Sequence, residues 1–319
     1  MEPVARGSSG QVWHAFDERL RRPVAVKLLN ADLAAPDRDR AYREAQALAS
    51  LSHAHVAAVY DCGIADDRPY LVLELIDGRS LAEVLATRGR LPWELSVACC
   101  AQVAAGLAAA HGRGVVHRDV TAANVMLTPA GVKLIDFGIS AVEGEPEVDP
   151  DGGLRGTPAY AAPERLNDAT VAASGDVYSL GVLLYRALSG GLPWQATTPQ
   201  QLLALQHSTE PAPLPQIEGL PGRIADVCMR CLDTDPGERP TAAQLAADLA
   251  DATGTPAFAE LAALGVHSAG VPTLTHLLPR GASGTRTTRR RRPRTRLVTL
   301  VAGVLAAATV AWWATYLAP

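Results

Sequence analysis

The sequence predicts an α+β fold with a small β-rich part, a larger helical part and a separate apolar segment near its C-terminal end. Within the first 75 residues, short runs typical of β-strands at 24–29 and 70–74 surround one helical stretch at 38–51. After residue 80 the apolar spacing is mostly helical. The clearest helical stretches are 93–111, 175–188 and 241–249. This order predicts two lobes with a cleft between them.

The composition fits a folded chain whose main part is acidic. At 319 residues and 48% hydrophobic, the chain can bury one or two sizeable cores, which excludes disorder for most of it. The formal net charge is −4, but residues 253–319 carry eight arginines and one acidic residue, so residues 1–252 have a net charge of −11. An acidic folded part argues against nucleic-acid binding by this part. The basic region at 253–319 favours binding to anionic phosphates.

The cysteines predict no disulfide framework, because there are five of them in a long chain. Cys228 and Cys231 form a C-x-x-C motif in a stretch with helical spacing, and no second Cys or His pair lies at the spacing of a zinc site. We expect both thiols to pack in a helix interface. Metal or redox use is the alternative.

The C-terminal region predicts a membrane anchor. Residues 297–317 are 21 consecutive residues without a charge, which as a helix would span about 31 Å, enough for a bilayer core. Trp312, Trp313 and Tyr316 lie near the far end, where interfacial aromatic residues are common. The arginine run Arg286–Arg296 precedes the segment and should stay in the cytoplasm near anionic lipid. A buried C-terminal core helix is the alternative.

These features divide the chain into a main domain at 1–252, a linker with the arginine run at 253–296 and a transmembrane helix at 297–317. The chain opens without the apolar run of a signal peptide. We therefore expect a single-pass protein of the cell membrane whose main domain lies in the cytoplasm.

A stretch rich in glycine and serine near the start is a candidate phosphate-binding loop. Its residues are Val4, Ala5, Gly7, Ser8, Ser9, Gly10 and Val12. Gly7 and Gly10 would let backbone N–H groups approach phosphates without interference from a Cβ atom. Taken alone, the stretch is more typical of an ordinary turn than of a nucleotide site.

Lys27, in the run Val24, Ala25, Val26, Lys27, is a candidate phosphate ligand. The chain has only two lysines, Lys27 and Lys133, among 29 basic residues, so a lysine suggests a site that needs a compact ammonium group. Glu44 lies on the following helical stretch and is the candidate ion-pair partner of Lys27. A solvent-exposed helix glutamate is the alternative for Glu44.

Two later motifs carry the remaining polar candidates. The first runs from His117, Arg118 and Asp119 to Asn124, and the second is Asp136, Phe137 and Gly138. Two carboxylates and an amide suit a hard cation that prefers oxygen ligands.

In this order, the motifs resemble those of the protein kinase family over residues 4–250. Further matches are Gly156 to Glu164, Asp176 to Gly181, and Arg239. The resemblance implies the two-lobed protein kinase fold, with an N-lobe at about 1–76 and a C-lobe at about 77–252. It also implies a buried, structural ion pair between Glu164 and Arg239.

The resemblance assigns roles to the candidates. Lys27 and Glu44 would pair at the α- and β-phosphates of ATP, Asp119 would accept or orient the proton of a substrate hydroxyl, and Asn124 and Asp136 would hold Mg²⁺ or Mn²⁺. The backbone of Glu74 and Ile76 would face adenine. Val12, Ala25 and Met126 would enclose the adenine ring.

The segment before Pro163 and Glu164 resembles that of Ser/Thr kinases, in the style of bacterial, actinobacterial, membrane-tethered regulatory kinases. The implied partners are ATP, proteins with Ser or Thr hydroxyls including the chain itself, and the lipid bilayer. The sequence leaves homodimerisation open and predicts no nucleic-acid partner.

Some positions depart from the family pattern. Thr121 replaces a lysine that neutralises the transferred phosphoryl group, and Ala5 replaces the first glycine of the loop. Loss of that lysine would cost orders of magnitude in rate unless another cation, for which Arg155 is the candidate, replaces it. A membrane-anchored pseudokinase that binds nucleotide is therefore the alternative to an active kinase.

Two further expectations concern neighbouring segments. Between Gly138 and Gly156 there is one hydroxyl residue, Ser140, among five acidic residues, and we predict that one carboxylate contacts Arg118; a solvated acidic loop is the alternative. Because the glycine-rich stretch begins near residue 4, we also expect little of the usual first strand.

Overall fold

The computed structural model describes residues 2–7, 10–29, 48–49, 51–65, 68–137, 141–142, 157–167 and 170–252. Of residues 2–7, 10, 141–142, 166–167 and 199 it describes the backbone alone. The predicted linker at 253–296 and the predicted transmembrane helix at 297–317 lie outside the described residues, as do Ser8, Ser9, Glu44 and Arg155.

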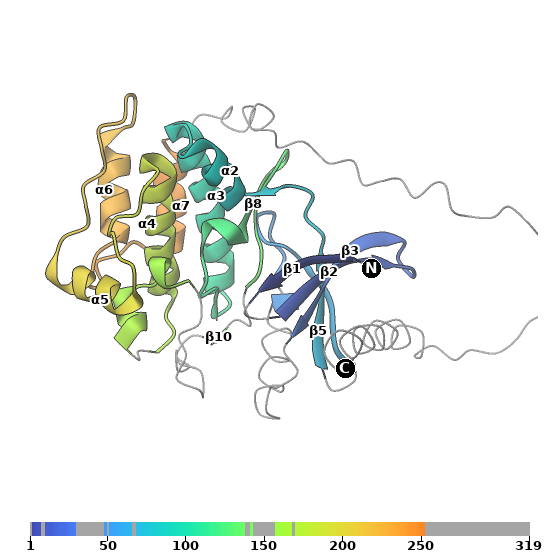
Figure 1. Cartoon of the computed structure of the whole chain (residues 1–319). Coiled ribbons are helices and arrows are strands. Elements are labelled where there is room, and N and C mark those ends of the chain that lie inside the picture. The colour runs from blue at the N-terminus through green and yellow to red at the C-terminus, as the bar shows by residue number, and fades with distance from the viewer. Residues whose placement is uncertain are drawn as a thin grey trace, which may run out of the picture.

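The N-lobe is a five-stranded antiparallel sheet with the strand order β1-β2-β3-β5-β4 (Figure 1). Its strands are β1 (Glu2–Gly7), β2 (Gly10–Asp17), β3 (Arg22–Leu29), β4 (Val59–Ala65) and β5 (Arg68–Glu74). The predicted strands 24–29 and 70–74 are confirmed and are longer by two residues at their starts. The expectation of a reduced first strand is wrong, because β1 is six residues long and five of these residues pair with β2.

Alternation along β3 places Lys27 on the face opposite the apolar cluster of the sheet. Leu28, Tyr70 and Ala65 form this cluster with Trp13, Val26 and Val72. Successive side chains of a strand point to opposite faces, so Ala25 and Lys27 lie on the other face. Both residues are nevertheless buried, with Lys27 only 3% exposed.

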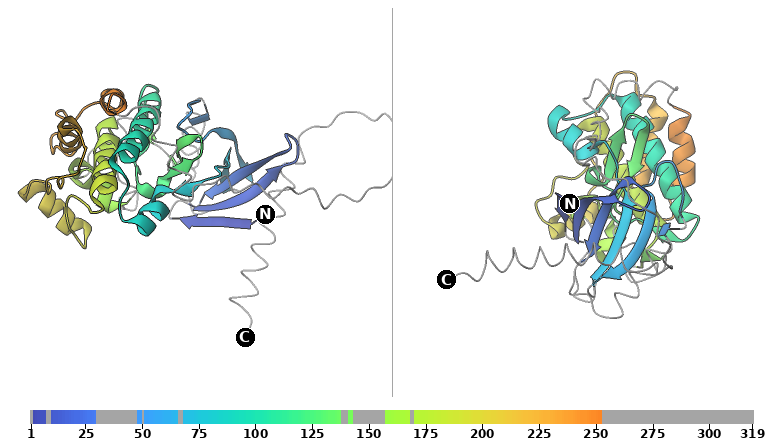
Figure 2. Two further views of the ribbon diagram at one scale, coloured as in Figure 1. Left: turned by 90° about the horizontal axis from the view of Figure 1, so that it is seen from above. Right: turned by 90° about the vertical axis from the view of Figure 1, so that its right-hand side faces the viewer.

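The C-lobe is mainly helical and lies beside the sheet (Figures 1 and 2). Its helices are α2 (Leu81–Arg88), α3 (Trp93–His111), α4 (Ala173–Ser189), α5 (Pro199–Ser208), α6 (Gly222–Cys231) and α7 (Ala242–Ala250). The short 3-10 helices are η1 (Ala122–Asn124), η2 (Pro158–Tyr160) and η3 (Pro163–Asn167). The three predicted helical stretches of the C-lobe are confirmed as α3, α4 and α7.

Short strands complete the C-lobe next to the N-lobe. They are β6 (Arg79–Ser80), β7 (Val115–Val116), β8 (Val125–Thr128), β9 (Gly131–Leu134) and β10 (Ala141–Val142). β6, β8 and β9 form one small sheet, and β10 pairs with β7. β7 and β8 flank residues 117–124, which contain Asp119 and are called the catalytic loop below, so these strands fix both ends of that loop.

Helix α3 is the core helix of the C-lobe. Within the described part of the chain it is the one helix long and apolar enough to cross a membrane, but most of it is buried. It packs against α4 and α7, which accounts for its apolar composition. Leu95, Val103 and Leu107 are completely buried on it.

The segment before β4 connects the two lobes. The N–H of Ala57 donates to the carbonyl of Leu134 at 3.0 Å, and the N–H of Leu134 donates to the carbonyl of His55 at 2.9 Å. Val56 and Leu134 form a parallel bridge between these bonds. The N-lobe sheet is therefore tied by its backbone to β9, three residues before Phe137.

The prediction that Cys228 and Cys231 pack in a helix interface is confirmed. All five thiols are free, and Cys228 and Cys231 are buried on α6. Burial raises the pKa of Cys231 to about 12, so this thiol stays protonated at neutral pH. No group of three His, Cys, Asp or Glu side chains suited to a metal occurs among the described residues.

Candidate active site

Asp176, in the first turn of α4, accepts two hydrogen bonds from the backbone of the catalytic loop. Its Oδ2 accepts the N–H of His117 and its Oδ1 accepts the N–H of Arg118, both at 2.8 Å. His111, at the end of α3, lies 2.8 Å from the same Oδ2. Burial raises the pKa of Asp176, but the hydrogen bond and charge of His111 and the contacts with His117 outweigh it, so the pKa lies below its ordinary value.

Arg118 has a left-handed backbone with φ of +69°. This conformation is unusual for a residue with a Cβ atom and is kept only where surrounding contacts impose it. The two bonds from Asp176 supply part of that restraint. As a result the chain turns sharply at the residue before Asp119.

Both carboxylate oxygens of Asp119 accept hydrogen bonds. The amide nitrogen of Asn124 donates to Oδ2 and to the backbone carbonyl of Asp119, both at 2.8 Å. The backbone N–H of Thr157 donates to Oδ1 at 3.0 Å. Thr157 belongs to the segment 138–165, which corresponds to the activation segment of the protein kinase family. These bonds fix the direction of the Asp119 side chain, which a residue that orients a substrate proton requires.

His117 holds Asp119 from the preceding turn. Its Nδ1 accepts the N–H of Asp119 at 3.2 Å, and its Nε2 lies 3.1 Å from the carbonyl of Ile135. These partners require a neutral ring with the proton on Nε2. Burial lowers the pKa of His117, against the opposing effect of Asp176 and Asp119, so the ring is neutral.

Lys27 and Asp136 meet across the two lobes. The buried ammonium of Lys27 on β3 forms an ion pair with Oδ1 of Asp136. Asp136 also has a left-handed backbone, with φ of +53°. The structure thus brings the predicted phosphate ligand against the predicted metal ligand, whereas Glu44 lies outside the described residues.

The donor atoms fit a divalent cation. Because Asn124 uses its amide nitrogen for both bonds to Asp119, its oxygen is the atom left to face a cation. Asp136 pairs with Lys27 through Oδ1 and keeps its second carboxylate oxygen, Oδ2, for a cation. Mg²⁺ characteristically takes only one or two protein ligands and completes its shell with phosphate oxygens and water, which matches this pair.

The residues expected around adenine come from four strands and the segment after β5. Val12 pairs with Lys27, Ala25 pairs with Leu73, and Met126 on β8 pairs with Ser80. Glu74 ends β5, and Ile76 follows it. In the candidate phosphate loop, Ala5 pairs with Val12 and Gly7 with Gly10, while Val4 lies at an irregularity of the β1–β2 pairing.

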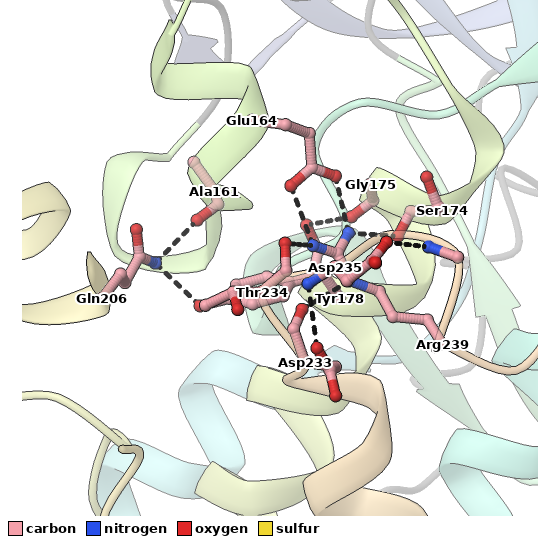
Figure 3. Close-up of polar contacts among 12 residues, drawn as sticks. Ala161, Glu164, Ser174, Gly175, Tyr178, Gln206, Asp233, Thr234, Asp235 and Arg239 are labelled. Carbon is pink, nitrogen blue, oxygen red and sulfur yellow. Dashed lines mark hydrogen bonds and ion pairs between the residues drawn. The ribbon is translucent and has the colours of Figure 1, made fainter. Parts of the chain in front are cut away.

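The structure confirms the predicted ion pair of Glu164 and Arg239 (Figure 3). Nη1 and Nη2 of Arg239 lie 2.6 and 2.8 Å from the two oxygens of Glu164. The guanidinium also donates to the carbonyls of Asp233 and Ser174 and lies over the ring of Tyr178. The pair joins the end of the activation segment to α4 and to the segment before α7.

Sequence reasoning missed several supporting residues. They are His111, Lys133, Thr157, Arg165 and Asp176. A signal existed for Lys133, because it is one of only two lysines, and the motif containing Asp176 was noticed without a role for its carboxylate. Thr157 and Arg165 contact the catalytic loop only because of the path that the activation segment takes, which no local sequence pattern predicts.

The two lobes, the Lys27–Asp136 pair and the Asp119–Asn124 loop define a protein of the protein kinase class. Residues 1–249 match the family described as the protein kinase domain, and the chain belongs to that family. All the motifs that resemble this family, from the glycine-rich stretch to Arg239, lie within the matched residues.

The relatives of the chain are bacterial Ser/Thr kinases. It is 36% identical over 243 residues to serine/threonine-protein kinase PknL of Mycobacterium tuberculosis, covering 74% of this chain and 60% of the relative. PknB of Mycobacterium leprae is 38% identical over 257 residues, covering 76% and 41%. Pkn2 of Myxococcus xanthus is 36% identical over 269 residues, covering 79% and 31%. The match therefore spans less than two thirds of each relative.

Proposed function

We propose that this chain is a Ser/Thr protein kinase that transfers the γ-phosphoryl group of Mg·ATP, or Mn·ATP, to Ser or Thr hydroxyls of proteins, itself included. The contact of Lys27 with Asp136 carries the proposal, because it places the one buried lysine of the described N-lobe against the carboxylate suited to the metal. The family and its relatives support this activity.

The protein's own groups perform three tasks in the transfer. Lys27 binds phosphate oxygens with a compact positive charge, and the metal, when bound, neutralises charge that develops on the phosphoryl group. Asp119 orients the attacking hydroxyl and receives its proton. A carboxylate oxygen can accept two hydrogen bonds, so a substrate hydroxyl can bind Oδ1 while the Thr157 amide keeps the carboxylate oriented.

Phosphate transfer from labelled Mg·ATP to the chain and to a generic protein tests the proposal. The full chain would be assayed in detergent or vesicles, with Asp119→Asn as the matched variant. Transfer that disappears in Asp119→Asn is the expected result. Nucleotide binding without any transfer would instead establish the pseudokinase alternative, which Thr121 and Ala5 favour.

We also propose that the protein is anchored in the cell membrane by residues 297–317 with the kinase domain in the cytoplasm and the arginine run near anionic lipid. The uninterrupted apolar length and the arginine flank support this arrangement. The proposal predicts that the full chain resists alkaline extraction from membranes. Leu305→Arg raises the free energy of membrane insertion by about 2.5–3.5 kcal/mol, so alkaline extraction should release part of this variant. Equal extraction of the variant and the unsubstituted chain would contradict the anchor.

A further inference from the structure

Arg165 is a buried arginine that reaches the catalytic loop from the end of the activation segment. It lies in η3, directly after Glu164, and is only 7% exposed. Whereas Glu164 pairs with Arg239, Arg165 donates Nη1 to the backbone carbonyl of Arg118 at 2.5 Å. A charged donor gives one of the stronger hydrogen bonds of a protein interior. The bond falls on the peptide group that joins Arg118 to Asp119.

Arg118 is therefore restrained on both sides. Its N–H donates to Asp176 at 2.8 Å, and its carbonyl accepts from Arg165. Between these bonds lies the left-handed backbone with φ of +69°. Such a conformation is unfavourable for a residue with a Cβ atom and persists only where several contacts determine it.

The position of Arg165 is itself fixed by close packing. A Cβ atom at Gly175 would lie 3.2 Å from Cδ of Arg165, so the arginine stem packs directly on the first turn of α4. The next residue on that turn is Asp176. One turn of helix thus supports both groups that hold the Arg118 backbone.

The activation segment contacts the catalytic loop at a second point. Thr157 donates its N–H to Oδ1 of Asp119, while Arg165 holds the preceding peptide group. The two ends of the described segment 157–165 therefore both contact this site. Thr157 binds the side chain of Asp119, and Arg165 binds the peptide group before it. A rearrangement of this segment would release the side chain and the backbone of Asp119 together.

We propose that Arg165 is a positioning residue that sets the orientation of Asp119 by holding the Arg118 carbonyl. It acts through the loop backbone and touches no reacting atom. The inference rests on the proposed kinase activity and extends it by assigning the coupling between the end of the activation segment and the catalytic aspartate to one guanidinium group.

Two substitutions separate this role from ordinary packing. Arg165→Met keeps an unbranched apolar stem against Gly175 but has no donor, and Arg165→Lys keeps a charged donor. The matched control is Arg223→Met, because Arg223 also donates to a backbone carbonyl, that of Asp251 at 2.7 Å, on an exposed part of the C-lobe. All variants would be made in the full chain.

We expect Arg165→Met to lower kcat at least tenfold, with the KM for ATP and the nucleotide Kd within twofold of the unsubstituted chain. Arg165→Lys should recover part of kcat, and Arg223→Met should leave it unchanged. A folded Arg165→Met variant with undiminished kcat would overturn the inference. A parallel loss of kcat and nucleotide affinity in both Arg165 variants would also overturn it, since that pattern indicates general loss of structure.

Amide hydrogen exchange of residues 117–119 supplies a readout independent of turnover. We expect faster exchange in Arg165→Met than in the unsubstituted chain and in Arg223→Met, and equal protection would overturn the contact's role. If the unsubstituted chain transfers no phosphate, the proposed function fails, whereas the exchange comparison still decides whether Arg165 holds the loop.

Discussion

The ammonium of Lys133 lies 2.8 Å from Oε2 of Glu74 and joins β9 of the C-lobe to the last residue of β5. The same oxygen accepts the N–H of Ala58 at 3.1 Å. One carboxylate oxygen therefore connects the strand that leads to the second lobe, the segment before β4, and β9. The backbone of Glu74 is also expected to face adenine, so this ion pair lies at the joint that nucleotide binding would use.

Removing the ammonium in Lys133→Met should lower the free energy of unfolding by at most about 1 kcal/mol, because both side chains are about one quarter exposed, at 25% and 24%. The direct measurement is a double-mutant cycle with Glu74→Gln in urea unfolding. We expect a coupling energy of about 0.5–1 kcal/mol and a larger change in the KM for ATP than in kcat. Strictly additive effects would show that the pair does not couple the segments.

The Glu164–Arg239 pair should contribute considerably more to the free energy of unfolding than the Lys133–Glu74 pair. The Arg239 side chain is fully buried and its guanidinium has several acceptors. Breaking a buried pair by removing one partner typically costs about 3–5 kcal/mol, because the other charge is left uncompensated. We therefore expect Arg239→Met to lower the free energy of unfolding by about that amount, as measured by urea denaturation.

A double substitution tests the cause of that loss. If the uncompensated carboxylate is responsible, Glu164→Gln with Arg239→Met should be more stable than Arg239→Met alone. The reverse order of stabilities would mean that the carbonyl contacts of Arg239, and not its charge partner, account for the effect.

His117 should make stability depend on pH. Its pKa in the folded chain is lowered by burial, whereas in the unfolded chain it lies near the ordinary value of about 6.5. Below about pH 6.5 the unfolded chain therefore binds more protons, and the free energy of unfolding decreases as the pH falls toward the folded pKa. Above that range the group has no effect.

The measurement is urea unfolding between pH 7.5 and 5.5 for the unsubstituted chain and for His117→Gln. Glutamine does not titrate but can still donate to the carbonyl of Ile135. We expect the unsubstituted chain to lose up to about 1.4 kcal/mol per pH unit more than the variant in the lower part of the range. Equal slopes would show that folding does not lower the pKa of His117.

The lobes and the main helices could be predicted because their signals are local. Helix α3 has the predicted limits 93–111, since Pro92 precedes its first residue and Gly112 follows its last. The apolar period of α4 and α7 is likewise contained within each stretch. The expectation for the first strand failed for the opposite reason, because β1 is recognised by its pairing with β2 and not by its own pattern.

The contacts that support the site could not be predicted in the same way. Lys133 and Glu74 are 59 positions apart, Asp176 and His111 are 65 apart, and Arg165 and Arg118 are 47 apart. No short-range pattern encodes such distances. The motifs identify Asp119 and Asp136 as candidate catalytic and metal-binding residues. The residues that orient these two can be recognised only once the positions of the lobes and of the activation segment are known.

Thr121 offers the most direct test of how the phosphoryl charge is balanced. It lies two residues after Asp119, is 4% exposed, and its carbonyl accepts the N–H of Asn124 at 3.1 Å. A lysine here would place an ammonium near the transferred group, where a fixed charge is worth more than in water. We expect Thr121→Lys to raise kcat about tenfold, which corresponds to a barrier lower by about 1.4 kcal/mol.

The control for added charge is Thr87→Lys, on the exposed side of α2, which should leave kcat unchanged. Initial rates at saturating Mg·ATP would be compared for the three proteins after their folding has been verified by thermal unfolding. A folded Thr121→Lys variant with unchanged or lower kcat would contradict the prediction, because it would mean that another cation already balances the charge. Substituting Arg155 in that variant and in the unsubstituted chain would then show whether Arg155 supplies it.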